Sequence, residues 1–390
     1  MSRRKRCFLY SQHLSGTGHF VRTYEIACAL AEEYEVYLSD GGRPVPRPRA
    51  IASLKLITLP RIYRSTAGII PLDSRESIEE IREQRKRSLL QATKQICPDV
   101  ILVEHFPFSK WELYAEIIPL IQLAQIVNQR VKVFCSLRDI PGRMRHDSKG
   151  EQHHLQVIQT LHQYFDGILV HADPQVVRLQ EHLSWVEQIT IPIEYTGYVS
   201  QKAAPHSVDE KFPHSHPSET AIVSAGGAGS LSLISNCIEA WEHPSIQNFT
   251  RDRQLLIFLP LFFSEDKLTS LQNYLNSDRI QIQHFSANFL NYLQTATLSI
   301  SQAGYNTCTN ILETRTPAIL IPNPAMSDQL PRSRILAERG LVTAIEPEYL
   351  SPTTLARAII ETISQPIITH KIDLNGSQNT RQILRKILDK

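Results

Sequence analysis

The sequence predicts an α/β protein with two domains, each built on a parallel sheet. Three observations support this prediction. The chain has 390 residues, 42% of them hydrophobic, which is more than a single core comfortably accommodates. Short apolar runs alternate with stretches of helical length, as they do in parallel βαβ units. Between Ser200 and Thr220 the alternation gives way to QKAAPHSVDEKFPHSHPSET, whose Pro, His and charged residues are typical of an exposed linker.

The alternation sets the expected domain limits and elements. We expect a first domain at 1–199, a linker at 200–219, a second domain at 220–370 and a C-terminal helix at 371–390. In that helix, apolar residues fall on one face, which predicts packing back onto the first domain. They are Ile383, Leu384, Ile387 and Leu388. The runs expected as strands are 7–10, 36–39, 54–59, 100–103, 131–136 and 167–171, then 221–224, 255–259, 280–282, 298–301, 318–321 and 342–345.

Composition and charge narrow the function classes. Lys and Arg number 41 against 39 Asp and Glu, a net charge of +2, so no global charge indicates a nucleic-acid or acidic partner. The six cysteines form no CxxC pair and mostly lie in apolar runs, as reduced core thiols do, which predicts a cytoplasmic protein. No segment is expected to span a bilayer, and no secretory signal is expected after the basic run Arg3–Arg6.

A glycine-rich turn, SGTGH at Ser15–His19, follows the first expected strand. Gly16 and Gly18 allow a strained backbone there, and His19 would stand at the N-terminus of the helix expected at 20–32, facing the cleft between the domains. The helix dipole would favour a neutral imidazole, which can accept a proton from a hydroxyl or from water. The alternative is that His19 only caps the turn.

The second domain has two glycine turns. In AGGAGS at Ala225–Ser230, Gly226 and Gly227 would let backbone amides approach a diphosphate. Further on, LSISQAGYNTCTNILETRTPAILIPNPAMSDQ at 298–329 reads as strand, glycine turn, helix, strand and polar loop. A helix beginning beside a glycine offers unpaired N–H groups to phosphate, although an ordinary helix–strand unit is the alternative. The expected ligand contacts are Gly304, Asn306 and Thr307 in the turn and Asp328 and Gln329 in the polar loop.

Polar residues that follow strands of the first domain are candidates on the acceptor side. Glu104 and His105 end one strand at the expected cleft edge, and His105 is an alternative base. Arg138 could clamp an acceptor phosphate or carboxylate, or form a structural ion pair with Asp139. The segment RIYRSTAGIIPL at Arg61–Leu72 is expected to be a loop. It would suit a lipid-linked acceptor or a membrane surface, or serve as a plain lid.

These motifs resemble the GT-B glycosyltransferases of family 28, which includes the N-acetylglucosaminyltransferase that forms lipid II. The resemblance spans nearly the whole chain. SGTGH matches the first glycine loop of the family, AGGAGS the second, and SQAGYNT through ETRTPAILIP the donor motif, in a GYNT form closer to a bacterial branch of predicted transferases. It implies two Rossmann-like domains facing a central cleft, with His19 as base, uracil near His284–Phe289 including Phe285, diphosphate at Gly304–Thr307, and donor-sugar hydroxyls at Asp328 and Gln329.

One position departs from the family. Six residues after the donor glycine the family usually has a glutamate that binds the ribose hydroxyls, whereas this chain has Asn310. Asparagine can still form hydrogen bonds, but it gives up a charge-assisted pair worth about 1 kcal/mol or more over a neutral bond. Glu313 lies three residues later on the helix, in a different direction. The departure indicates a weakened or altered donor site.

The expected function is that of an inverting glycosyltransferase, which moves GlcNAc or a related hexose from a UDP-sugar to a hydroxyl of a small molecule, a lipid-linked acceptor or a glycan. No cofactor or metal is expected, because no DxD motif stands at a plausible diphosphate site and helix amides can carry the charge. Peripheral contact with the inner face of the membrane is an open alternative. Two other functions remain: a nucleotide-sugar hydrolase like that of pseudaminic acid synthesis, whose GxGHxxR opening is matched by Gly16, Gly18, His19 and Arg22, and a non-catalytic GT-B binding or scaffold protein.

Overall fold

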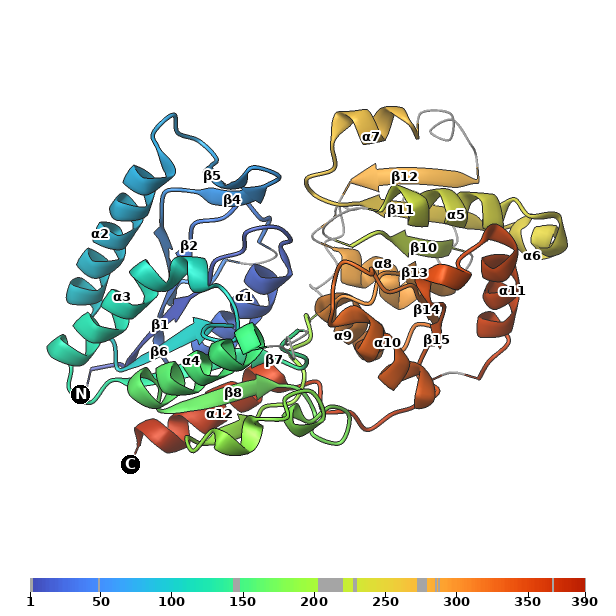
Figure 1. Cartoon of the computed structure of the whole chain (residues 1–390). Helices are drawn as coiled ribbons and strands as arrows, with labels where there is room; N and C mark the ends of the chain where they lie inside the picture. Colours follow the sequence, from blue (N-terminus) through green and yellow to red (C-terminus); the bar gives the residue numbers. More distant parts are fainter. Residues whose placement is uncertain are drawn as a thin grey trace. The chain divides into compact units, whose positions relative to one another are not determined.

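The computed structural model describes residues 3–47, 50–142, 148–202, 220–226, 230–271, 279–284, 286, 288–366 and 368–389. It divides into two compact units (Figure 1). The first comprises Met1–Val45, Arg49–Ser200 and Ile372–Lys390, and the second comprises Pro46–Pro48 and Gln201–Lys371. The division between Ser200 and Gln201 falls where the linker at 200–219 is expected to begin, and residues 203–219 of that linker lie outside the described residues.

The first unit is built on a parallel sheet whose described strands have the order β3-β2-β1-β6-β7-β8-β9. The strands are β1 (Arg6–Tyr10), β2 (Glu35–Asp40), β3 (Leu54–Thr58), β6 (Val100–Glu104), β7 (Lys132–Arg138), β8 (Gly167–His171) and β9 (Ile193–Tyr195). The longer helices are α1 (Gly18–Leu30), α2 (Ile78–Ile96), α3 (Tyr114–Val127), α4 (Ser148–Tyr164) and α12 (Gly376–Leu388), and the short helical turns are Trp111–Leu113, Leu179–Glu181 and Val186–Gln188. β6 and β8 are buried at every position, as central strands of parallel sheets are.

The expectation of a loop at Arg61–Leu72 is wrong. The segment contains an antiparallel hairpin of β4 (Ile62–Ser65) and β5 (Gly68–Pro71), in which Tyr63 lies opposite Ile70. Its turn depends on Gly68, whose φ of 110° favours glycine. β4 and β9 mix polar with apolar residues and are partly exposed, and β5 is a half-buried pair of isoleucines between Gly68 and Pro71. None of the three presents the apolar run that marks the buried strands.

The second unit has a parallel sheet of the order β12-β11-β10-β13-β14-β15. The strands are β10 (Thr220–Ser224), β11 (Gln254–Leu259), β12 (Ile280–His284), β13 (Leu298–Ser301), β14 (Ala318–Leu320) and β15 (Thr343–Ala344). The helices are α5 (Leu231–Trp241), α6 (Gln247–Thr250), α7 (Glu265–Thr269), α8 (Phe289–Thr295), α9 (Tyr305–Thr314), α10 (Gln329–Glu338) and α11 (Pro352–Ile363), with short turns at Pro244–Ile246 and Pro347–Tyr349. The predicted α/β class with two parallel sheets is confirmed.

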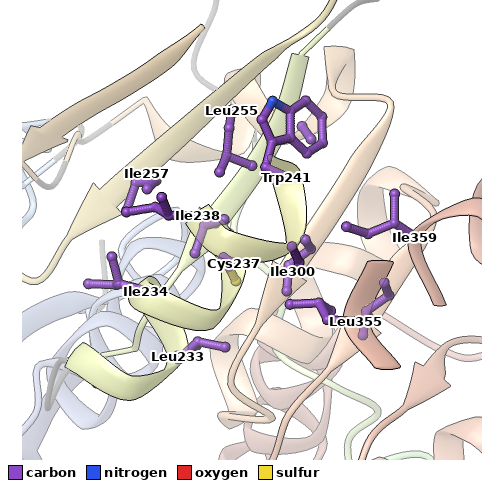
Figure 2. Close-up of a cluster of buried hydrophobic side chains, with 14 of the residues drawn as sticks. Leu233, Ile234, Cys237, Ile238, Trp241, Leu255, Ile257, Ile300, Leu355 and Ile359 are labelled. Carbon is purple, nitrogen blue, oxygen red and sulfur yellow. The ribbon is translucent and has the colours of Figure 1, made fainter. Parts of the chain in front are cut away.

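The alternation of side chains along β11 divides the core of the second unit between the two faces of its sheet. Leu255 and Ile257 pack with α5 and α11, and Figure 2 shows Leu255 beside Trp241 and Ile257 near Ile238, both residues of α5. Leu256 and Phe258 pack on the other face with residues of α8. Since successive residues of a strand point to opposite faces, an apolar run of this kind is the pattern of a sheet covered on both sides.

The C-terminal helix α12 belongs to the first unit. Its Leu384 is fully buried in one core cluster with Phe20 and Tyr24 of α1. Arg381 forms ion pairs with Glu32 and Glu33, which follow α1. The apolar face read from the sequence is therefore the face that lies against α1.

Two further observations concern the whole described chain. None of its helices has the length and apolar character needed to span a bilayer. The six cysteines are free, and all except Cys97 are buried. Burial raises the pKa of the Cys7, Cys135 and Cys237 thiols, which keeps them protonated and unreactive.

A buried ion pair holds the loops that follow the strands of the first unit. Arg85 of α2 is fully buried and lies 2.7 Å and 2.9 Å from the two carboxylate oxygens of Glu116 in α3. Its guanidinium also donates to the Gln12 side chain at 2.8 Å and to the Pro60 carbonyl at 2.8 Å. Tyr10 donates to the same carboxylate of Glu116. The Arg85 guanidinium thus joins the loops that follow β1 and β3 to α2 and α3.

We expect Arg85→Met to lower the free energy of unfolding by about 3–5 kcal/mol, because it leaves the Glu116 carboxylate buried without its cation. Denaturant titration monitored by far-UV circular dichroism measures the change. Arg87→Met is the matched control, since Arg87 is exposed on the same helix and its loss should change stability by less than about 0.5 kcal/mol. Equal effects of the two substitutions would contradict a special role for Arg85.

Candidate functional site

The first turn of α1 places His19 at the carboxyl end of the first sheet. β1 ends at Tyr10, the chain crosses Ser11–Thr17, and α1 begins at Gly18, so His19 is the second residue of the helix. The expectation of strained glycines in this turn is wrong. Neither Gly16 nor Gly18 is among the described glycines with positive φ.

A buried carboxylate gathers the charged groups of this site. Glu104, the last residue of β6, has a side chain that is only 1% exposed. One of its oxygens lies 2.5 Å from Nδ1 of His19 and also accepts from Arg22, three residues further along α1. Its other oxygen accepts from Lys110, in the loop after β6. Parallel pairing of β1 with β6, in which Tyr10 lies opposite Val103, brings these elements together.

Electrostatics keep Glu104 charged and His19 neutral. Burial by itself would raise the pKa of Glu104, but His19, Lys110 and Arg22 outweigh burial and hold that pKa well below its usual range. Burial lowers the pKa of His19 to about 4, against an opposing contribution from Glu104. Lys110 also has a lowered pKa, chiefly from burial. Near neutral pH the site therefore holds a carboxylate and a neutral imidazole.

The contact with Glu104 fixes the tautomer of His19. An ionised carboxylate only accepts hydrogen bonds, so Nδ1 must carry the hydrogen and Nε2 must carry the lone pair. The His19 side chain is 26% exposed, whereas Glu104 is shielded. In this arrangement His19 can act as a general base. Once its Nε2 takes a proton, the positive charge of the ring is balanced by the Glu104 carboxylate at Nδ1. Glu104 was singled out in the sequence only as a strand-end residue, and its role as partner of His19 was missed.

The other acceptor-side candidates lie in the same part of the first unit. His105 directly follows Glu104 and its ring meets that of His19 edge to face, with centroids 5.5 Å apart. Arg138 ends β7, the neighbour of β6 in the sheet. Its charge lowers the pKa of both histidines. The structure thus brings His19, His105 and Arg138 together around Glu104.

In the second unit, two glycines expected to approach a diphosphate have different constraints. Gly226 has a φ of 67°, a backbone conformation that favours glycine, whereas a Cβ there would meet only the movable end of the Gln302 side chain, whose Oε1 would lie 2.6 Å away. Gly304 has a φ of −66° as N-cap of α9, and the nearest atom to an added Cβ is Oγ1 of Thr307 at 3.7 Å. Asn306 and Thr307 lie half-buried in the first turn of α9. Gly227 and Phe285 lie outside the described residues.

The polar loop after β14 is tied to the Gly304 turn by a cation that sequence reasoning missed. Arg332 is 2% exposed, pairs with the Asp328 carboxylate at 2.8 Å and donates to the carbonyl of Ala303 at 2.8 Å. The spacing of four residues between Asp328 and Arg332 on a helix was the available signal. Gln329 is also engaged, since its Oε1 accepts from the backbone N–H of Asn323 at 2.9 Å.

The Asn310 side chain bonds another residue of the chain, whereas the family pattern implies that this position binds the ribose hydroxyls of the donor. Its side chain is nearly buried, and its Nδ2 donates to Oε1 of Gln201 at 3.0 Å. Glu313 lies 3.0 Å and 3.2 Å from Nζ of Lys202. Helix α9 is therefore held by the segment that enters the second unit, and Glu313 is already paired. Among the described residues no group of three His, Cys, Asp or Glu side chains could hold a metal ion.

Comparison with known proteins places this geometry in context. Residues 252–375 match the glycosyltransferase family 28 C-terminal domain. A UDP-N-acetylglucosamine–N-acetylmuramyl-(pentapeptide) pyrophosphoryl-undecaprenol N-acetylglucosamine transferase of Synechocystis sp. is 28% identical over 172 residues, which are 42% of this chain and 43% of that protein. Its counterpart in Gloeothece citriformis is 34% identical over 84 residues, 21% of this chain and 23% of that one. The chain thus spans less than half the length of these curated relatives.

Solved structures resemble the whole chain in fold. TcCGT1 in complex with UDP has a TM-score of 0.65 at 13% identity, covering 99% of this chain and 94% of that one. The glycosyltransferase of kitacinnamycin has a TM-score of 0.61 at 14% identity, covering 99% and 100%. MurG of Acinetobacter baumannii has a TM-score of 0.55 at 13% identity, covering 98% and 99%. The chain therefore has the GT-B fold of two Rossmann-like domains, and within its second half residues 252–375 match the glycosyltransferase family 28 C-terminal domain.

Proposed function

We propose that the protein is an inverting glycosyltransferase that moves GlcNAc or a related hexose from a UDP-sugar to a hydroxyl acceptor. The observation that carries the proposal is the His19–Glu104 pair, a base backed by a buried carboxylate, in a chain whose other half carries a family 28 domain. The proposed donor follows that of the Synechocystis and Gloeothece relatives, which are named as transferases of UDP-N-acetylglucosamine. The acceptors to screen are small-molecule, glycan and lipid-linked alcohols.

In the proposed reaction, Nε2 of His19 takes the proton of the acceptor hydroxyl while its oxygen attacks C1 of the sugar. The bond between C1 and the diphosphate oxygen breaks, UDP leaves with the electron pair, and attack from the opposite side inverts C1. The carboxylate of Glu104, 2.5 Å from Nδ1, then faces an imidazolium and stabilises its charge. This gives Glu104 a task in the transition state rather than in substrate binding.

The donor side of the proposal rests on helix α9. Its first backbone N–H groups and the positive end of its dipole would meet the charge that grows on the departing diphosphate. α9 has 10 residues and is tied down at Asn310 and Glu313, so these donors are fixed before the reaction begins. The proposal assigns no metal or other cofactor.

The donor is tested first by thermal shift with UDP, GDP, dTDP, ADP and UDP-GlcNAc, because a ligand that binds the folded state at 100 times its Kd stabilises it by about 2.7 kcal/mol. We expect a shift selective for UDP and UDP-GlcNAc. No shift with any nucleotide would favour a non-catalytic protein. UDP released from UDP-GlcNAc without acceptor, at the rate seen with the best acceptor, would favour a hydrolase.

His19→Ala should lower kcat by about 10²- to 10⁴-fold, the usual contribution of a general base, and leave the Kd for UDP unchanged. The two quantities are measured by UDP release and by calorimetric titration. His243→Ala is the control, since His243 is a partly exposed histidine of the second unit that bonds Ser245. Turnover that survives in His19→Ala would contradict the assignment of the base.

Gly304→Ala should weaken UDP binding by about tenfold or more, since a methyl group would stand where the phosphate approaches and cost a charge-assisted hydrogen bond. The free protein should fold normally, because the added Cβ meets no atom closer than 3.7 Å and φ is −66°. Thr353→Ala, in the first turn of α11, is the control for a change at another helix start. Equal Kd values for UDP in wild type and Gly304→Ala would contradict the proposal that the diphosphate binds at this turn.

Glu104→Gln should lower the pKa of His19 further below about 4, because the Glu104 charge is the main group that raises it. A base is active when unprotonated, so activity of the wild type should be flat through neutral pH and fall only as pH drops toward about 4. NMR titration of the His19 ring and the pH profile of kcat/KM measure these two effects. A His19 pKa that rises in Glu104→Gln would contradict the account of the pair.

A further inference from the structure

The residue that follows Glu104 has an unusual backbone. His105 has a φ of 65°, in the left-handed region that few residues other than glycine adopt. Lys110, at the other end of the same loop, also has a φ of 65°. Such conformations persist where the surroundings hold them, and they cluster at functional sites. Here the Ser109 N–H donates to the His105 carbonyl at 3.0 Å, which closes the loop.

The ring of His105 has one nitrogen with a hydrogen-bond partner and one nitrogen without a partner among the described residues. Nδ1 lies 3.0 Å from the hydroxyl of Ser109. The residue is only 1% exposed, and its Nε2 has no hydrogen-bond partner among the described residues. An unpaired buried ring nitrogen needs a partner that the described chain does not supply, either a ligand atom or an ordered water. The ring stands edge to face with His19, at a centroid distance of 5.5 Å.

His105 is unsuited to be a second base. Burial, reinforced by the charge of Arg138, holds its pKa well below the usual histidine value, so the ring is neutral and a weak proton acceptor. Glu104 has both oxygens engaged by His19, Arg22 and Lys110, so its charge raises the pKa of His105 only through space and does not offset burial and Arg138. A proton taken by His105 would therefore lack a counter-charge in contact with it.

We propose that His105 is a positioning residue that holds the oxygen of the acceptor alcohol through its Nε2–H, so that the hydroxyl hydrogen points to Nε2 of His19. The inference rests on the glycosyl transfer proposed above and names the chemical class that binds there, a hydroxyl that receives one hydrogen bond and gives another. His105 keeps its proton throughout, so the only proton transferred is the one from the alcohol to His19.

Ser109 selects the required tautomer. A neutral imidazole carries hydrogen on one nitrogen and a lone pair on the other. If the Ser109 hydroxyl donates to Nδ1, the hydrogen of the ring must lie on Nε2 and face the acceptor. The opposite tautomer would place two lone pairs, those of His19 and His105, in competition for a single alcohol hydrogen. Ser109 is thus part of the proposed positioning device.

The test uses His105→Asn and His105→Gln. Asparagine tolerates positive φ and keeps a polar atom near the position of Nδ1, whereas glutamine reaches the position of Nε2. The probe is UDP-GlcNAc with water as the acceptor, measured as UDP release. We expect His105→Asn to release UDP about 10- to 100-fold more slowly, as for the loss of a hydrogen bond at the reacting oxygen, with wild-type Tm and wild-type Kd for UDP. His105→Gln should recover most of that rate.

Three results separate this inference from the proposed function. Wild-type rates in His105→Asn, with His19→Ala inactive, would overturn the role of His105 alone. A loss that His105→Gln does not recover, in variants with unchanged Tm, would also overturn it.

The tautomer is measured independently of turnover by ¹⁵N NMR of the His105 ring. Hydrogen on Nε2 in the wild type, becoming mixed in Ser109→Ala, supports the inference, and hydrogen on Nδ1 overturns it. A wild type that binds neither UDP nor UDP-GlcNAc contradicts the proposed function, and the tautomer then decides the inference about His105.

Discussion

The buried carboxylate of Glu104 is the interaction on which the first unit's candidate site depends. It is almost fully shielded from solvent, yet it stays charged, because an imidazole, a guanidinium and an ammonium group share its two oxygens. An isolated buried charge would cost far more than folding can supply, so the carboxylate and its partners are stable only together. The same contact that satisfies Glu104 orients His19 and leaves its Nε2 as an acceptor. Structure and proposed chemistry therefore rest on one group.

In the proposed reaction the second unit has a different task, which is to present backbone donors to an anion. Its α9 is fixed from two sides: Gln201 and Lys202 hold its side chains, and His370 contacts the Leu312 carbonyl at 3.0 Å. Arg332 fixes the turn that precedes the helix through the Ala303 carbonyl. Donors that are held before the ligand arrives need no reorganisation when charge develops. Asn310, which stands where the family usually has a glutamate, is part of this framework through its bond to Gln201.

Much of the fold could be predicted from local pattern, and the site only in part. The apolar runs of the buried parallel strands are readable even in the three-residue β14, whereas β4, β5 and β9 are partly exposed and present no such run. His19 was predictable because it lies in a turn beside a helix start. Its contact with Glu104 joins residues 85 positions apart and depends on which strand pairs with β1, which no local pattern specifies. The i, i+4 pair of Asp328 and Arg332 was readable in principle, but its contact with Ala303 was not.

The central claim is that His19 and Glu104 act as a single unit, and a double-mutant cycle on kcat tests it most directly. UDP release is compared for wild type, His19→Ala, Glu104→Gln and the double variant. If Glu104 acts only through His19, the double variant should be no slower than His19→Ala alone, because groups that act together are strongly non-additive. Losses that multiply in the double variant would show that the two residues act independently, and would contradict the account.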